Sequence, residues 1–114
     1  MKFMMRVVLF IVVSSSLYAD SYGRLLLYGN CITCHHETKS ISAPSLQIIV
    51  KRYKEAFPEK EQFVEYMSNW VLNPDKNTSL MEDMINKYEL MPHLGYDKDT
   101  LEKIAIYIYH YKIQ

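Results

Sequence analysis

The sequence predicts an all-α fold, a compact single domain of about four to five helices, on three observations. No segment alternates apolar and polar residues with a period of two for long, as half-buried strands do. Apolar residues recur instead at the three- and four-residue spacing of amphipathic helices. The chain of 114 residues is 49% apolar and has only 3 glycines, which suits one small core rather than several domains.

Residues 1–19 have the organisation of a secretory signal peptide, with a basic start followed by a continuous apolar run at residues 7–13. Small residues follow, and we expect cleavage between Ala19 and Asp20. A retained membrane anchor is the alternative, but a spanning helix needs about 20 apolar residues and this run weakens earlier. The mature domain would then cover residues 20–114.

Charge and export restrict the partners of the chain. The whole sequence has 13 basic and 13 acidic residues, and loss of Lys2 and Arg6 with the signal peptide leaves 11 basic residues against 13 acidic ones. A mildly acidic domain does not favour nucleic acid, because phosphate binding needs a basic surface. The signal peptide also predicts a periplasmic location, where two nearby thiols tend to form a disulfide unless another reaction consumes them.

The first two expected helices precede Pro58. The first runs from a cap at Asp20 or Ser21 toward Gly29. Its apolar residues at helical spacing are Tyr22, Leu25 and Leu26. The second has Pro44 in its first turn, where the missing N–H has no intrahelical partner to lose. Its apolar face consists of Leu46, Ile49, Val50 and Tyr53.

Three further helices are expected between Pro58 and the end of the chain. The third runs from Glu59 to the turn at residues 73–75, with Phe63, Tyr66, Met67, Trp70 and Val71 on one face. A capping box at residues 79–82 predicts a short fourth helix with Met81, Met84, Ile85 and Tyr88 on its apolar face. The last helix opens at Asp97 or Asp99 and runs to the chain end, with Leu101, Ile104, Ala105, Ile108 and Tyr111 on one side.

The only two cysteines lie in Cys31-Ile32-Thr33-Cys34-His35, which has the C-x-x-C-H pattern of covalent haem attachment. Two thiols at this spacing can form thioethers with neighbouring vinyl groups of one haem, while the imidazole that follows can bind the iron. A haem would consume both thiols in an oxidising compartment. It would also supply a large apolar plate to a domain whose own core is small.

Four landmarks in residues 20–114 resemble the small mono-haem class I c-type cytochromes. They are the C-x-x-C-H pattern at Cys31 to His35, Ala43-Pro44-Ser45-Leu46, Met91-Pro92 and a closing helix rich in aromatic residues. The resemblance implies a cytochrome c-like domain around one covalently bound haem c and its iron. It also implies that the N-terminal helix crosses the C-terminal helix at Gly23, and we expect Tyr107 or Ala105 to lie across from this glycine.

The same resemblance assigns the proximal side of the iron. It implies that Cys31 and Cys34 carry the haem and that a ring nitrogen of His35 binds the metal. The carbonyl of Pro44 would accept a hydrogen bond from the other ring nitrogen, which fixes the tautomer and raises the basicity of the ligand. Ala43 stands where the family often has glycine.

Met91 is the expected distal ligand, because it lies in a loop and Pro92 stiffens the chain behind its thioether. His93 is the alternative, and it would make a bis-histidine centre of lower potential. The other methionines downstream of the haem motif, Met67, Met81 and Met84, are interpreted as core filler on helix faces. His36 and His110 are interpreted as surface residues.

Trp70 is the only tryptophan, and its place on a helix face indicates core packing. A functional interpretation is that its indole N–H donates to a haem propionate, as an aromatic residue does in some members of the family.

The function implied by the resemblance is electron transport rather than enzymatic catalysis. The iron would cycle between Fe(II) and Fe(III), and the partners would be redox proteins, a donor and an acceptor. We expect a monomer that meets these partners over small, transient interfaces, including docking on membrane respiratory complexes.

Three alternatives stay open at this stage. A haem-based gas sensor or a peroxide-handling protein would have an open or histidine-ligated distal face. A C-x-x-C dithiol redox protein would need the strands of a βαβ pattern, which the sequence does not predict. A zinc site could use Cys31, Cys34 and either His35 or His36, but structural zinc takes four ligands.

Overall fold

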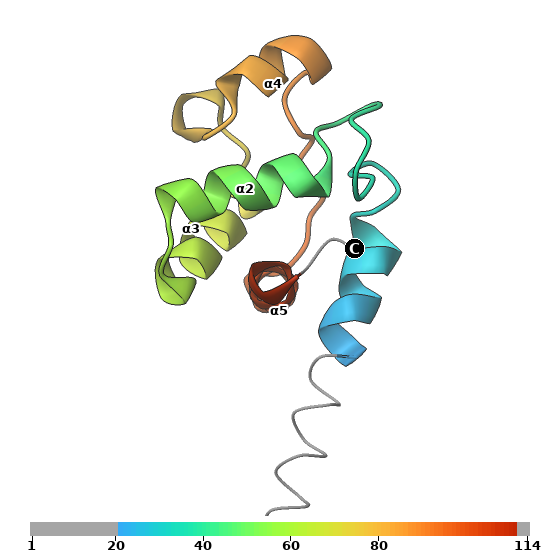
Figure 1. Cartoon of the computed structure of the whole chain (residues 1–114), viewed down its shortest axis with the longest axis vertical. Helices are drawn as coiled ribbons and strands as arrows, with labels where there is room; N and C mark the ends of the chain where they lie inside the picture. Colours follow the sequence, from blue (N-terminus) through green and yellow to red (C-terminus); the bar gives the residue numbers. More distant parts are fainter. Residues whose placement is uncertain (1–20, 112–114) are drawn as a thin grey trace, which may run out of the picture.

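The computed structural model describes residues 21–111, and this range is helical with no strand (Figure 1). A helix covers residues 21–30. The elements that follow are α2 (Leu46–Ala56), α3 (Lys60–Leu72), the 3₁₀ helix η1 (Lys76–Thr78), α4 (Glu82–Tyr88) and α5 (Lys98–His110). The all-α prediction is therefore confirmed. The expected signal peptide and its Ala19/Asp20 cleavage site lie outside the described residues.

α5 lies between the α2 and α3 pair and the helix of residues 21–30, and Figure 1 shows it nearly end-on, with α4 on the far side of α2. α3 and α5 make the most extensive contact between labelled helices. The buried core comes from these helices and consists of Leu27, Leu46, Tyr53, Phe63, Met67, Ile104, Ala105 and Ile108. No helix among residues 21–111 is both long enough and apolar enough to cross a lipid bilayer.

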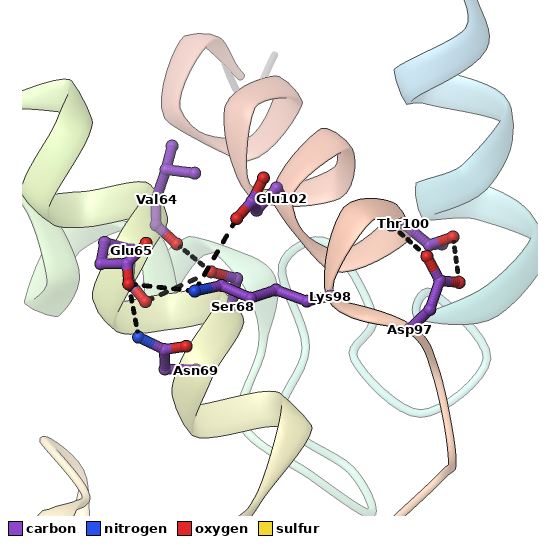
Figure 2. Close-up of polar contacts among 8 residues, drawn as sticks. All are labelled: Val64, Glu65, Ser68, Asn69, Asp97, Lys98, Thr100 and Glu102. Atoms are coloured by element: carbon purple, nitrogen blue, oxygen red, sulfur yellow. Dashed lines mark hydrogen bonds and ion pairs between the residues drawn. The ribbon is translucent and has the colours of Figure 1, made fainter.

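Figure 2 shows polar contacts within α3 and α5 and one ion pair that joins them. The Lys98 Nζ lies 3.0 Å from a carboxylate oxygen of Glu65, so an ion pair bridges the two helices. The buried Ser68 hydroxyl donates to the Val64 carbonyl at 2.7 Å, which satisfies it inside the core. Asp97 is the N-cap of α5, where its side chain accepts from the Thr100 N–H at 3.1 Å. Of the two expected caps, the structure uses Asp97.

The helix of residues 21–30 crosses α5 at Gly23, as expected. A Cβ atom added to Gly23 would lie 2.9 Å from the Cβ of Tyr107, closer than two such atoms approach. Tyr107 is therefore the residue across the crossing, while Ala105 lies in the core. The absence of a side chain at residue 23 permits this close approach.

The expected apolar face of that first helix was wrong in part, because only Leu26 of its three residues packs against the core. Leu27 is fully buried, whereas Leu25 is 69% exposed and Tyr22 is 43% exposed. Gly23 and Leu27 lie one turn apart, and the close approach at Gly23 turns this side of the helix toward α5.

Two predicted helix starts were also wrong. α4 begins at Glu82 with Met81 as its N-cap, and the Ser79 hydroxyl instead accepts from the Met81 N–H at 2.9 Å in a local turn. Pro44 precedes the first turn of α2, because Ser45 is the N-cap and accepts from the Ile48 N–H at 3.3 Å. At the other end of the chain, α5 stops at His110.

Candidate functional site

A deep cavity lies between the C-x-x-C-H segment, α2, α3, α4 and α5. It contains about 940 Å³ of space free of protein atoms, counted out to its open mouth. Its walls are mostly aliphatic, aromatic and methionine side chains, and a few polar groups converge on it. This combination is typical of sites for cofactors and small molecules.

The proximal wall comes from a single helical turn that continues the helix of residues 21–30. The Cys31 N–H donates to the Leu27 carbonyl at 2.9 Å, and the His35 N–H donates to the Cys31 carbonyl at 2.8 Å. Residues four apart in such a turn share one side. Cys31 and His35 both line the cavity.

The imidazole of His35 is held in a defined orientation. Its Nδ1 lies 2.8 Å from the Pro44 carbonyl oxygen, the contact that the resemblance implied. A carbonyl can only accept, so Nδ1 carries the proton and Nε2 keeps its lone pair for a metal. The Pro44 carbonyl is positioned in turn by its neighbours, because the Ser45 N–H donates to the Ser40 hydroxyl at 2.9 Å and the Leu46 N–H to the His36 carbonyl at 2.9 Å.

The two cysteines occupy different environments. Both thiols are free; Cys31 is partly buried and lines the cavity, whereas Cys34 is exposed and outside the lining. Burial, and secondarily the neighbouring Cys34, raises the pKa of the Cys31 thiol to about 11. A dithiol oxidoreductase needs a thiolate with a lowered pKa. The Cys31 environment therefore does not favour the dithiol alternative.

The opposite wall brings methionine thioethers to the cavity. Met91 lines it, whereas His93 is exposed and outside the lining, which favours Met91 over His93 as a distal ligand. Met67, Met81 and Met84 also line the cavity. Met67 and Met81 are also buried core residues, as interpreted from the sequence, so they serve the core and the cavity wall together. Met67 and Met84 lie on helices, Met81 is the N-cap of α4, and Met91 lies in the loop between α4 and α5.

The backbone is strained just before that loop. Glu89 follows α4 with φ 75° and ψ 169°, a region that is populated almost only by glycine. Glu89 lines the cavity as well. This conformation ends α4 abruptly and sends the chain toward Met91.

Trp70 lies in the wall of the cavity and already has a hydrogen-bond partner. Its indole Nε1–H donates to the Asp75 carbonyl at 3.0 Å. A propionate contact would have to share or replace this bond, and it stays a prediction.

Tyr53 is a site residue that the sequence interpretation assigned only to the core. It is 5% exposed and lines the cavity, and its hydroxyl forms no hydrogen bond with any residue in the described range. Burial raises the pKa of this hydroxyl far above its ordinary value, so it stays a donor. Among the described residues no buried side-chain polar atom lacks a partner, so this hydroxyl opens into the cavity, where an acceptor on a bound group can receive its hydrogen bond. The signal available in the sequence was a tyrosine among the aliphatic residues of the α2 face.

These groups fit a haem and do not fit zinc. The cavity offers apolar walls for a flat ring, a thiol, an imidazole with a free Nε2, a thioether and an unpartnered hydroxyl. Zinc needs several His, Cys, Asp or Glu side chains gathered together, and residues 21–111 contain no group of three or more.

Comparison with known proteins adds no assignment. No family model matches the chain, and no curated protein or solved structure matches it significantly.

Proposed function

We propose that this chain is an exported mono-haem c-type cytochrome of the periplasm that carries single electrons between redox proteins. The haem would be attached through Cys31 and Cys34, with His35 and Met91 as axial ligands. When bound, it supplies a one-electron Fe(II)/Fe(III) couple. No substrate bond is made or broken, so the proposed role is that of a carrier and not of an enzyme.

One observation carries this proposal. Cys31 and His35, one helical turn apart, line the same apolar cavity as Met91, which is distant from them in the chain. The His35 Nδ1 is bound to the Pro44 carbonyl, so that Nε2 remains available. Such a carbonyl partner fixes the orientation of a metal-binding imidazole. A cavity built only to hold an apolar ligand would need neither the thiol nor an oriented imidazole.

Each remaining group has a role in this proposal. The aliphatic walls exclude water and hold the site at low dielectric, which raises the cost of unpaired charge inside it. The Tyr53 hydroxyl would donate to a carboxylate of the bound group and so fix its orientation. The exposed Cys34 lies one residue before His35 and would form the second thioether.

Two measurements on the protein expressed with a haem-attachment system test the proposal. The pyridine haemochrome spectrum should show haem held by two thioethers, and intact mass should match residues 20–114 plus one haem. A spectrum without bound haem contradicts the proposal. Rapid binding of carbon monoxide to the reduced protein would instead favour the gas sensor or peroxide-handling alternative, because a filled sixth position excludes external ligands.

A further inference from the structure

A second surface feature, an open groove on the outer face of α3, is not used by the haem site. Its floor is aromatic, formed by Phe57, Tyr66 and Trp70, and its acidic rim is formed by Glu61 and Glu65. We call these five residues the α3 groove. Aromatic and charged groups that are exposed together are typical of the surfaces that proteins use to recognise partners.

The floor of the α3 groove is held rigid before any partner arrives. The Tyr66 hydroxyl donates to the Thr78 carbonyl, and the Trp70 indole donates to the Asp75 carbonyl at 3.0 Å. The Phe57 and Tyr66 rings pack with their centroids 4.7 Å apart. Binding to such a floor costs little side-chain entropy, because the rings are already fixed.

Aromatic side chains also form the wall between this groove and the cavity. Among the described residues, Trp70 alone lines both the α3 groove and the cavity. A second connection runs from Tyr53 in the cavity to Tyr66 in the groove, with an edge-to-face contact and 6.3 Å between ring centroids. A partner in the α3 groove would therefore be separated from the cavity by aromatic rings and not by a full layer of protein.

The charge of the α3 groove determines which charge a partner must carry to bind there. The charged side chains that line it are both glutamates. Glu61 is exposed and forms no ion pair within residues 21–111. Glu65 pairs with Lys98 at 3.0 Å, so its charge is largely balanced and Glu61 sets the sign of the charge in the groove. A cation is thus attracted and an anion repelled at this surface.

We propose that the α3 groove docks a redox protein that presents lysine or arginine side chains beside an apolar residue, and that Trp70 and the Tyr53–Tyr66 pair form the electron route to the cavity. This inference rests on the proposed cytochrome function. One electron passes between the iron and the partner's own redox cofactor, and no proton or covalent bond changes. A small, transient interface of this kind is usual for electron-transfer partners.

The test uses tris(1,10-phenanthroline)cobalt(III), an oxidant that combines positive charge with aromatic faces and so reproduces the chemistry of the partner. Glu61→Lys should slow its reaction with the reduced protein by about three- to tenfold at low ionic strength, and added salt should remove most of the difference. Asp99→Lys is the matched control, because it makes the same charge change on the exposed side of α5 that faces Lys103. Equal slowing by both variants would overturn the docking site.

Binding is measured separately from electron transfer. Adding the cobalt complex to the oxidised protein should shift the amide signals of Glu61 and Asn69 and the single indole signal of Trp70, and Glu61→Lys should abolish these shifts.

For the electron route, Trp70→Leu should slow the reaction without changing the shift at Glu61, and Trp70→Phe should restore most of the rate. Shifts that map elsewhere, or unaltered rates in Trp70→Leu, would reject the proposal. The haemochrome spectrum of the same sample decides the proposed function, so a failure of docking is distinguished from a failure of haem attachment.

Discussion

The two sides of the cavity differ in how firmly the chain holds them. On the proximal side, residues 31–47 are tied by backbone hydrogen bonds, among them Leu46 N–H to the His36 carbonyl at 2.9 Å and Gln47 N–H to the Glu37 carbonyl at 3.0 Å. On the distal side, residues 90–96 form no backbone–backbone hydrogen bond within the described range. The loop that carries Met91 therefore depends on its two ends and on side-chain contacts.

Those distal contacts are few, and the ion pair among them is exposed. α4 is anchored to α2 by a bidentate contact in which the Arg52 guanidinium binds both oxygens of Asp83, with Nη2 and Oδ2 2.7 Å apart. The Tyr96 hydroxyl donates to the Asn30 side chain at 3.1 Å. Regions with few buried contacts open at lower free energy than the core. The difference indicates that His35 is preorganised for the iron, whereas Met91 lies on a loop that opens more easily.

The largest expected effect separates the two axial ligands. His35→Ala should lower the yield of haem-loaded protein by at least roughly 10–100-fold, which is the usual effect of removing only the hydrogen-bond partner of a metal ligand. Met91→Ala should retain the haem but lose the far-red absorption band of sulfur-to-iron ligation in the oxidised protein. The measurement is the ratio of haem absorbance to protein mass, together with the far-red spectrum.

Met84→Ala is the matched control for the distal side, because Met84 lines the same cavity from α4 and not from the loop. It should keep the far-red band. Persistence of the band in Met91→Ala, or its loss in Met84→Ala, would show that the distal ligand has been assigned to the wrong methionine.

The second effect tests the crossing of the helix of residues 21–30, which leads to the proximal side, with α5. Gly23→Ala should destabilise the fold by about 1–3 kcal/mol, because the new Cβ would meet the Tyr107 Cβ at 2.9 Å and the two helices would have to move apart. Gly29→Ala is the control in the same helix, where an added Cβ meets nothing within 4 Å. It should stabilise by up to about 1 kcal/mol. Denaturant unfolding measures both, and similar values for the two variants would disprove the tight crossing.

The third effect tests the strain at the start of the distal loop. Glu89→Gly should raise the free energy of unfolding by about 1 kcal/mol, because glycine adopts φ 75° without the penalty that a side chain incurs. Lys87→Gly, in the helical last turn of α4, should lower it by about 1 kcal/mol. Unfolding midpoints of the two variants should thus move in opposite directions. A loss of stability in Glu89→Gly would mean that the residue is not strained.

The smallest effect concerns pH and the anchor of α4. The hydrogen bonds from Arg52 hold the pKa of Asp83 below its ordinary value of 3.8. Because the folded-state pKa is depressed, this contribution to stability is present above about pH 4 and is lost as the pH falls through the folded value. Asp83→Asn should therefore melt at a lower temperature than the wild type at pH 7, and the gap should close at acid pH. A gap that is unchanged by pH would exclude the ionised pair as its source.

Much of the fold could be predicted from the sequence because helices obey local rules. Apolar spacing predicted α2, α3 and α5, Pro58 correctly marked the end of α2, and Asp97 was one of two expected caps. The capping box predicted at Ser79 was wrong. A serine followed by a glutamate three residues later satisfies the pattern even when the hydroxyl accepts a hydrogen bond in a local turn instead. The prediction that Leu25 lies on the apolar face was wrong because helical spacing does not determine which side of a helix meets its neighbour.

Local sequence was sufficient for the proximal side of the site, since Cys31 and His35 lie one helical turn apart and any helix brings them to one side. Only the tertiary structure brought Met91 to the opposite wall, left the Tyr53 hydroxyl without a partner and placed Trp70 between the cavity and the α3 groove. These features depend on how α2, α3, α4 and α5 pack against one another. Spacing along a chain specifies the apolar side of each helix, whereas the angle and rotation at which helices meet are set by side chains from distant segments.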